Sequence, residues 1–313
     1  MNSYLVLAIT GAVLGMFQFG YNTGNINSPE AEIRKFIKES FRDRDGKMLC
    51  AESTKTYFSI AVSMFLIGGL IGSLSGGVVA DKFGRKRGLL MTQVFSILGA
   101  ILTGCCKVAS SYEMLLIGRL IIGLAAGLFT GLAPLYVAEI SPISIRGAMG
   151  TVNQLAVTSG ILTSMVLGLG SVLGGGDSWP ILLALTIVPS IIQCLILPFM
   201  PETPRYLILS QGKMEEGRKA LEKLRNNTDV QHEIEELQNE ESAHKETAVT
   251  IWQLLMSSKL RLSLFVCICL HLSQQLSGIV AIFYYSTSFF EGGGITRENS
   301  QYGKCCFLNF AAC

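Results

Sequence analysis

The stretch Gly76-Gly77-Val78-Val79-Ala80-Asp81-Lys82-Phe83-Gly84-Arg85-Lys86-Arg87 places a tight cluster of charge between two long apolar runs. These runs extend over residues 57–80 and 88–106, and roughly 20 apolar residues are enough to cross the ~30 Å hydrocarbon core of a bilayer. The pattern therefore predicts a membrane hairpin with a short basic turn. Four bases outnumber one acid in residues 81–87, and an excess of Lys and Arg in a short loop indicates the cytoplasmic side. The alternative interpretation is that these charges only set the topology of the hairpin.

Composition supports an integral membrane protein. Half of the 313 residues are hydrophobic, 15% are charged and the mean hydropathy is +0.45, which is unlike a soluble domain of this length. The net charge of +2 is explained by bases in loops, so we expect no nucleic-acid partner. Most of the nine cysteines fall in apolar runs without the spacing of a zinc site. We expect no metal and no cofactor.

Seven apolar runs predict an all-α fold with that many membrane spans. Glycines recur every fourth residue in two of the runs, which predicts close helix packing there. Residues 25–56 form a polar segment that we expect outside the cell, with a helix start at Ser28-Pro29-Glu30. The charged residues 206–258 predict short amphipathic helices on the cytoplasmic surface. The spans are expected over residues 5–24, 57–80, 88–106, 114–138, 148–171, 179–200 and 262–290.

Polar residues inside these runs are the candidates for function. Gln154 lies with Thr151 and Thr158 on one stripe of the fifth run. Gln274 and Gln275 lie side by side in the middle of the seventh, where amides are unfavourable unless they meet a polar group. Hydrogen bonding between helices is the alternative explanation. Arg119, just inside the fourth run, is expected to extend to the interface, with a polar cavity as the alternative.

Together these segments resemble the sugar-porter branch of the major facilitator superfamily, and most of all the animal facilitative glucose transporters (solute carrier family 2). The resemblance covers about residues 5–295. It implies two six-helix halves joined by a cytoplasmic helical domain, with a sugar site at the midplane. The matching motifs are Gly20–Gly24, Asp81–Arg87, Gly118-Arg119, Glu139–Gly147, Gln154, Pro201–Arg205, Gln274–Gly278 and Phe283–Ser286.

The resemblance also implies roles for individual residues. Gln154, Gln274 and Gln275 would hydrogen-bond the hydroxyls of a hexose, because an amide offers donors and acceptors without a charge to desolvate. Two departures affect sugar preference: Val280 stands where the family carries Asn, and His271-Leu272-Ser273 replaces Gln-Leu-Ser. Ile282 is a further selectivity candidate. A cytoplasmic latch would hold the outward-facing state, formed by Asp81, Arg85, Lys86, Glu139, Arg146, Glu202 and Arg205.

Asn22 indicates the energetics of transport. Proton-coupled relatives carry aspartate at this position, whereas an amide cannot load and release a proton. The resemblance therefore implies passive uniport of glucose, with fructose as an alternative substrate, and proton symport is the less favoured alternative. We find no nucleophile–base set or phosphate loop, which argues against an enzyme.

The length of the chain leaves another alternative open. By resemblance, residues 1–200 are the first six-helix half, 201–258 the cytoplasmic domain, 259–291 the seventh helix and 292–313 a divergent tail. The later helices have no counterpart, so we expect either a truncated transporter or a non-transporting chain that associates with full-length transporters. The plasma membrane is the expected location, with the N-terminus in the cytoplasm.

Overall fold

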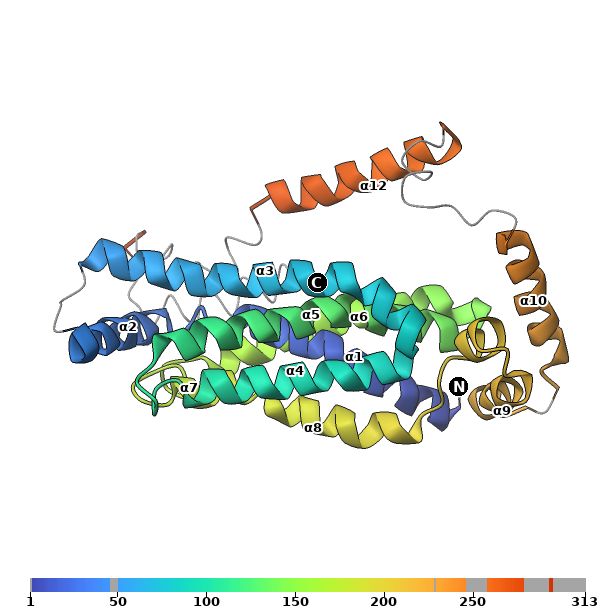
Figure 1. Ribbon diagram of the computed structural model, residues 1–313, viewed down its shortest axis with the longest axis horizontal. Coiled ribbons are helices and arrows are strands. Elements are labelled where there is room, and N and C mark those ends of the chain that lie inside the picture. Colours follow the sequence, from blue (N-terminus) through green and yellow to red (C-terminus); the bar gives the residue numbers. More distant parts are fainter. Residues whose placement is uncertain (1, 46–49, 228, 246–257, 279–292, 295–313) are drawn as a thin grey trace.

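A computed structural model describes residues 2–45, 50–227, 229–245, 258–278 and 293–294 (Figure 1). Every regular element in these ranges is helical, as the apolar runs predict. The elements are α1 Ser3–Gly24, α2 Glu30–Asp45, α3 Ala51–Phe83, α4 Arg85–Cys105, α5 Tyr112–Ile140, η1 Ile143–Ile145, α6 Arg146–Leu167, α7 Trp179–Ala184, α8 Ile187–Ile196, η2 Leu197–Phe199, the π-helical turn η3 Tyr206–Ser210, α9 Met214–Arg225, α10 Gln231–Lys245 and α12 Ser258–Leu276.

Five helical segments in the described residues are long and apolar enough to cross a membrane. They are α1, α3, α4, α5 and the segment Trp179–Phe199, which is formed by α7, α8 and η2. The fifth expected span corresponds to α6, which has 22 residues. Helix α6 is long enough but less apolar than the others, because its polar stripe interrupts the hydrophobic sequence. It packs along α1 in the bundle (Figure 1).

Two expected spans are not continuous helices. The sixth is interrupted at residues 185–186, between α7 and α8. Pro189 explains the interruption, since its ring clashes with the carbonyl four residues earlier and it has no N–H to donate. In the seventh, α12 ends at Leu276 and Gly278 has a φ of +78°, a left-handed conformation that is incompatible with helix. The regular helix of this expected span therefore ends before Gly278, and residues 279–290 lie outside the described residues.

The glycine spacing in α3 and α5 brings their backbones together, as predicted. A Cβ on Gly68 would lie 2.1 Å from the carbonyl oxygen of Leu120, and one on Gly123 would lie 2.1 Å from that of Phe65. The approach of Gly76 to Gly131 is looser, because a Cβ on Gly76 would lie 3.9 Å from the Cα of Gly131. The two helices are therefore in close backbone contact at Gly68 and Gly123 and are farther apart at Gly76 and Gly131.

Helix α1 passes through the middle of the bundle, in contact with α5, α6 and α8. Its small side chains Ala8 and Ala12 are fully buried against large ones from α5, such as Phe129 and Tyr136. At one end of the bundle α1 reaches α9, where the side-chain amide of Asn2 donates to the carbonyl of Lys223 at 2.8 Å. We call this end, which also carries residues 81–87, the basic end.

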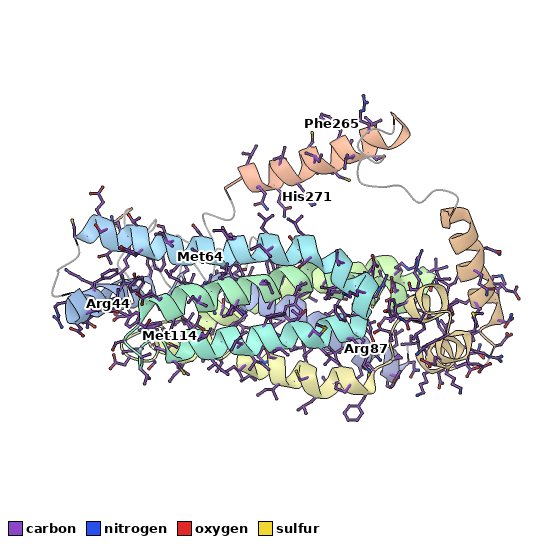
Figure 2. All side chains as sticks on the ribbon, viewed as in Figure 1. Arg44, Met64, Arg87, Met114, Phe265 and His271 are labelled. Atoms are coloured by element: carbon purple, nitrogen blue, oxygen red, sulfur yellow. The ribbon has the colours of Figure 1, made fainter. Side chains whose placement is uncertain are left out.

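Helix α12 lies apart from the other helices (Figure 1). Figure 2 labels Phe265 and His271 on it, and both side chains are exposed. Leu262 and Leu270 are 72% and 65% exposed, so this apolar helix has no packing partner among the described residues. The expected cytoplasmic helices are present as η3, α9 and α10, and the expected helix after Pro29 is α2.

Candidate functional site

A one-residue turn at the basic end brings α3 into α4. Helix α3 ends at Phe83, α4 begins at Arg85, and Gly84 between them has a φ of +88°. A side chain at this position would be strained, and its Cβ would lie 2.6 Å from Oε2 of Glu202. Glycine is therefore required here both by the backbone conformation and by the approach of Glu202.

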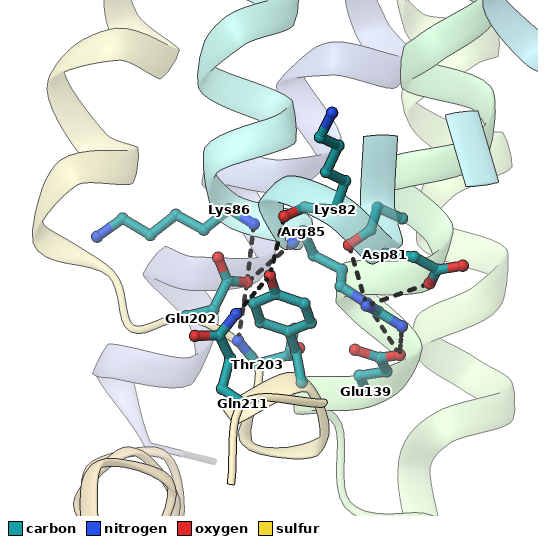
Figure 3. Close-up of polar contacts among 10 residues, drawn as sticks. Asp81, Lys82, Arg85, Lys86, Glu139, Glu202, Thr203 and Gln211 are labelled. Carbon is teal, nitrogen blue, oxygen red and sulfur yellow. Dashed lines mark hydrogen bonds and ion pairs between the residues drawn. The ribbon is translucent and has the colours of Figure 1, made fainter. Parts of the chain in front are cut away.

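Glu202 caps the start of α4 from a distant part of the chain (Figure 3). Its Oε1 accepts hydrogen bonds from the backbone N–H groups of Arg85 at 3.0 Å and Lys86 at 2.9 Å. The N–H of Thr203 donates to the same oxygen at 3.1 Å. The first N–H groups of a helix have no partner within the helix, and the helix dipole favours a negative charge there. Glu202 thus ties the segment after η2 to the turn between α3 and α4.

Arg85 and Glu139 form the buried centre of the basic end. Nη2 and Nε of Arg85 donate to Oε1 of Glu139 at 2.9 and 3.2 Å, and Nη1 donates to the carbonyl of Ala80 at 3.1 Å. The guanidinium also lies over the ring of Tyr206, 5.3 Å from its centroid. The two charged side chains are only 11% and 7% exposed, so each depends on the other for compensation of its charge.

The remaining predicted latch residues surround this pair. Asp81 lies 3.7 Å from Nη1 of Arg85 but is 81% exposed, so its contribution is small. Lys86 donates from Nζ to the carbonyl of Pro198 at 2.8 Å. Arg146 and Arg205 line a cavity of about 350 Å³ together with Arg85 and Glu139. Among the described residues Glu139 pairs with Arg85, and Arg146 lines the cavity beside this pair.

A buried polar cluster in the middle of the bundle joins α1, α4 and α8. Gln18 of α1 and Gln93 of α4 both donate from Nε2 to Oε1 of Gln193 on α8, at 3.0 and 2.5 Å. The hydroxyls of Ser96 and Ser190 both donate to Oε1 of Gln18, at 2.8 and 2.9 Å. All five side chains are at most 1% exposed. Gln93 and Gln193 are each the single amide in an apolar run, and that is the signal that could have indicated this glutamine cluster.

The Asn22 amide is held in place on every side. Its Oδ1 accepts from Oγ1 of Thr186 at 2.9 Å and from Nδ2 of Asn25 at 3.2 Å, while its Nδ2 donates to the carbonyl of Gln18 at 2.9 Å. Nη1 of Arg119 donates to the Asn22 carbonyl at 3.0 Å. Arg119 is fully buried and lies 4.5 Å over the ring of Phe65. The expectation that Arg119 extends to the interface is wrong, because it points into this polar region.

The structure does not assemble the predicted sugar-binding residues. Gln154 is exposed on α6, whereas Gln274 and Gln275 are exposed on α12, and no hydrogen bond joins the two sets in the described part of the chain. His271, Leu272 and Ser273 are also exposed on α12 (Figure 2). Val280 and Ile282 lie outside the described residues. The exposed side-chain amide of Gln154 can therefore contact a ligand or another helix that approaches α6.

Solved structures show the same fold. The xylose transporter XylE from E. coli in a partially occluded inward-open conformation has a TM-score of 0.79 and 22% identity, covering 99% of this chain and 69% of that one. The proton:xylose symporter XylE bound to 6-bromo-6-deoxy-D-glucose has a TM-score of 0.79 and 24% identity, with the same coverage. The described helices therefore belong to a major facilitator fold.

Sequence comparisons identify the family. The chain is 44% identical over 298 residues to facilitated glucose transporter member 1 of solute carrier family 2 from Gallus gallus, covering 95% of this chain and 61% of that relative. It is 44% identical over 292 residues to member 3 from Ovis aries, covering 93% and 59%. The chain thus spans about three fifths of the length of these relatives. A family model described as sugar (and other) transporter matches residues 7–313, and the chain belongs to this family of membrane transporters.

Proposed function

We propose that this chain supplies the N-terminal part of a facilitative hexose transporter, with glucose as the first candidate substrate. The relatives at 44% identity are named facilitated glucose transporters. Because the chain spans only about three fifths of those relatives, transport is proposed for the assembly that this chain helps to build.

The amide at Asn22 carries the proposal of uniport. It is 2% exposed and bonded through both amide atoms, and an amide does not titrate at physiological pH. The acids in the described spans lie close to the helix ends, at Glu52 and Asp81 in α3 and at Glu113 and Glu139 in α5. Glu139 is already paired with Arg85. A proton would therefore have no carrier deep in these spans, and sugar would move only down its own gradient.

Sugar recognition is proposed to use Gln154 of α6 with Gln274 and Gln275 of α12. Each exposed amide offers two N–H donors and a carbonyl acceptor, which match the paired donor and acceptor character of a sugar hydroxyl. Val280 would remove one such group, so we expect weaker sugar binding than in relatives that carry Asn there. His271-Leu272-Ser273 and Ile282 would then adjust which hexose is preferred.

The basic end is proposed to act as the latch of alternating access. Glu202 connects the segment before η3 to the turn between α3 and α4, and the Arg85–Glu139 pair connects α4 to α5. A movement of any of these helices relative to the others would therefore separate buried charges from their partners. Asp81, Lys86, Arg146 and Arg205 would add contacts around them. This proposal places residues 201–258 and the N-terminus in the cytoplasm of a plasma-membrane protein. Residues 1–200 would then form one of the two halves that rock against each other, residues 259–291 would begin the second half, and residues 292–313 would be a tail.

Uptake by proteoliposomes tests these proposals. Labelled glucose and fructose are offered to vesicles that contain this chain alone, in which uptake requires copies of the chain to associate into a complete transporter. A full-length relative is the positive control. Saturable uptake that is insensitive to an imposed pH gradient supports uniport, whereas uptake that follows the pH gradient overturns it. Gln154→Leu is expected to reduce uptake at least ~10-fold, while Ser159→Ala, on the same helix, serves as the matched control.

A second candidate function is association with full-length transporters without transport. The observation that favours it is the exposed apolar surface of α12, which has no partner among the described helices. Purification of a tagged full-length relative together with this chain, combined with no uptake by the chain alone, would support this function. Uptake by the isolated chain would exclude it as the sole role.

A further inference from the structure

A pocket at the basic end is lined by an unusual number of bases. It has a volume of about 350 Å³ and lies between the first turn of α4, residues 200–207 and α9. Its charged lining comprises five bases and two acids: Lys86, Arg87, Lys213, Lys219, Lys223, Glu202 and Glu216. Figure 2 labels Arg87 at this end of the bundle, close to α9. We call this cavity the basic pocket.

Both acids of the basic pocket are already engaged. Glu202 accepts the N–H groups at the start of α4, and Glu216 lies 3.3 Å from Nζ of Lys213. The Nζ of Lys86 donates to a backbone carbonyl. Because these interactions occupy both acids, the remaining bases give the pocket a surplus of positive charge.

Three bases remain without an acidic partner in the described part of the chain: Arg87, Lys219 and Lys223. The two lysines are four residues apart and therefore share one face of α9, where like charges at this spacing repel one another. A cavity lined by unpaired bases raises the local concentration of anions. Topology alone does not explain these charges, because the three bases converge on a single cavity from α4 and α9.

The pocket adjoins an apolar surface of the molecule. Met200 lines it, and Phe199, the preceding residue in η2, is 76% exposed. Leu195 and Ile192 on α8 are 63% and 42% exposed, so the segment that leads into the pocket lining carries exposed apolar side chains in the proposed membrane region. A ligand with a phosphate group and an acyl chain would match both features at once.

We propose that the basic pocket binds a phosphate ester, held by Arg87, Lys219 and Lys223. A phosphate presents several strong acceptor oxygens and a negative charge, and Arg offers a forked donor set for it. The ligand can be the head group of an anionic membrane phospholipid or a soluble phosphate ester, because the two share this chemistry. The adjacent apolar surface favours the lipid. This site is separate from the sugar-binding amides and from the Arg85–Glu139 pair.

Thermal unfolding of the detergent-solubilised chain tests the proposal, because a ligand that binds only the folded state raises the unfolding midpoint. The probes are short-chain phosphatidic acid, glycerol 3-phosphate and short-chain phosphatidylcholine. We expect a saturable rise with phosphatidic acid and none with phosphatidylcholine. A rise with glycerol 3-phosphate at similar concentrations identifies a soluble ester as the ligand, whereas a rise confined to phosphatidic acid identifies the lipid.

Two charge-matched variants complete the experiment. Lys219→Gln/Lys223→Gln removes two bases from the pocket, and Lys35→Gln/Lys38→Gln removes two exposed bases from α2 at the opposite end of the bundle. We expect the pocket variant to weaken the apparent affinity for the phosphate ester ~10-fold or more, and the α2 variant to leave it unchanged. Equal weakening in both variants, or no rise in the wild-type protein, would overturn the proposal. All four lysines are exposed, so both variants are expected to fold, and their midpoints without ligand check this.

Discussion

Arg85 and Glu139, 54 residues apart in sequence, form a hydrogen-bonded ion pair in which Nη2 lies 2.9 Å from Oε1 and both side chains are nearly buried. Removing one member of a buried pair leaves an uncompensated charge, which destabilises a protein by about 3–5 kcal/mol. The pair therefore holds α4 against α5 at the basic end. Any opening of this end must separate the two charges or expose them to water.

Glu139→Gln is expected to lower the free energy of unfolding by about 3 kcal/mol or more, because Arg85 stays buried without its counter-charge. The measurement is denaturant unfolding in detergent. Asp81→Asn is the matched control: Asp81 faces the same arginine but is 81% exposed, so its loss is expected to change stability by less than about 1 kcal/mol. Equal effects of the two variants would show that the burial of Glu139 does not set the strength of the interaction.

Gly84→Ala is expected to destabilise the chain by about 1–3 kcal/mol, since a side chain at a φ of +88° is strained and would meet the carboxylate of Glu202. Gly77→Ala, in the neighbouring turn of α3, is the control. A Cβ there would meet no atom within 4 Å, so alanine is expected to be neutral or to stabilise the helix by up to about 1 kcal/mol. Comparison of the thermal unfolding midpoints distinguishes the two, and a stabilising Gly84→Ala would contradict the turn geometry.

Gly123→Ala is expected to push α5 away from α3, because the added Cβ would lie 2.1 Å from the carbonyl oxygen of Phe65. Overpacking of this kind destabilises by about 1–3 kcal/mol. Gly76→Ala tests the looser third contact of the same interface and is expected to be tolerated, since its nearest neighbour would be 3.9 Å away. Cysteine cross-linking between α3 and α5 reports whether the helices have separated. Similar tolerance at both positions would argue against the interlocked packing.

Gln18→Leu is expected to lower the stability of the fold, whereas Gln154→Leu is expected to lower sugar uptake. Gln18→Leu removes the acceptor that the hydroxyls of Ser96 and Ser190 share and one donor to Gln193, although Ser190 keeps the carbonyl of Thr186 as an acceptor. Loss of these buried hydrogen bonds is expected to destabilise by about 1–3 kcal/mol. Gln154 is exposed, so Gln154→Leu is expected to leave unfolding unchanged and to reduce sugar uptake. Unfolding and uptake measured on both variants make the comparison. A loss of stability in Gln154→Leu would mean that this amide has a structural role.

Cys50 tests the proposed orientation of the basic end. It is exposed immediately before α3, at the end of the helix opposite residues 81–87. In a variant that keeps Cys50 as its single cysteine, a membrane-impermeant maleimide is expected to label intact cells. A single cysteine introduced by Lys219→Cys is expected to react only after permeabilisation. The reverse pattern would invert the orientation and place residues 201–258 outside the cell.

Local sequence patterns were sufficient for most of the helices. The lengths of the apolar runs predicted α1, α4 and α5 to within about three residues, because a span needs a continuous apolar length. Helix α3 begins at Ala51, six residues before its expected start, because its first turns are polar. The four-residue glycine spacing predicted close helix packing by α3 and α5, but the structure was needed to show that these two helices pack against each other. Motif resemblance brought together the right residues at the basic end, including Arg85, Glu139 and Glu202, although it did not specify their pairing.

Tertiary structure alone decided the partners of the polar groups. Glu139 accepts from Arg85 rather than Arg146, and Arg119 turns inward, because in a low-dielectric bundle each charge binds the partner that the helix packing places within reach. The glutamine cluster depends on three helices meeting at one level, which no single run of sequence reveals. The sequence by itself therefore determined which segments become helices and that polar groups must be satisfied inside them, whereas the packing of the helices chose which groups satisfy one another.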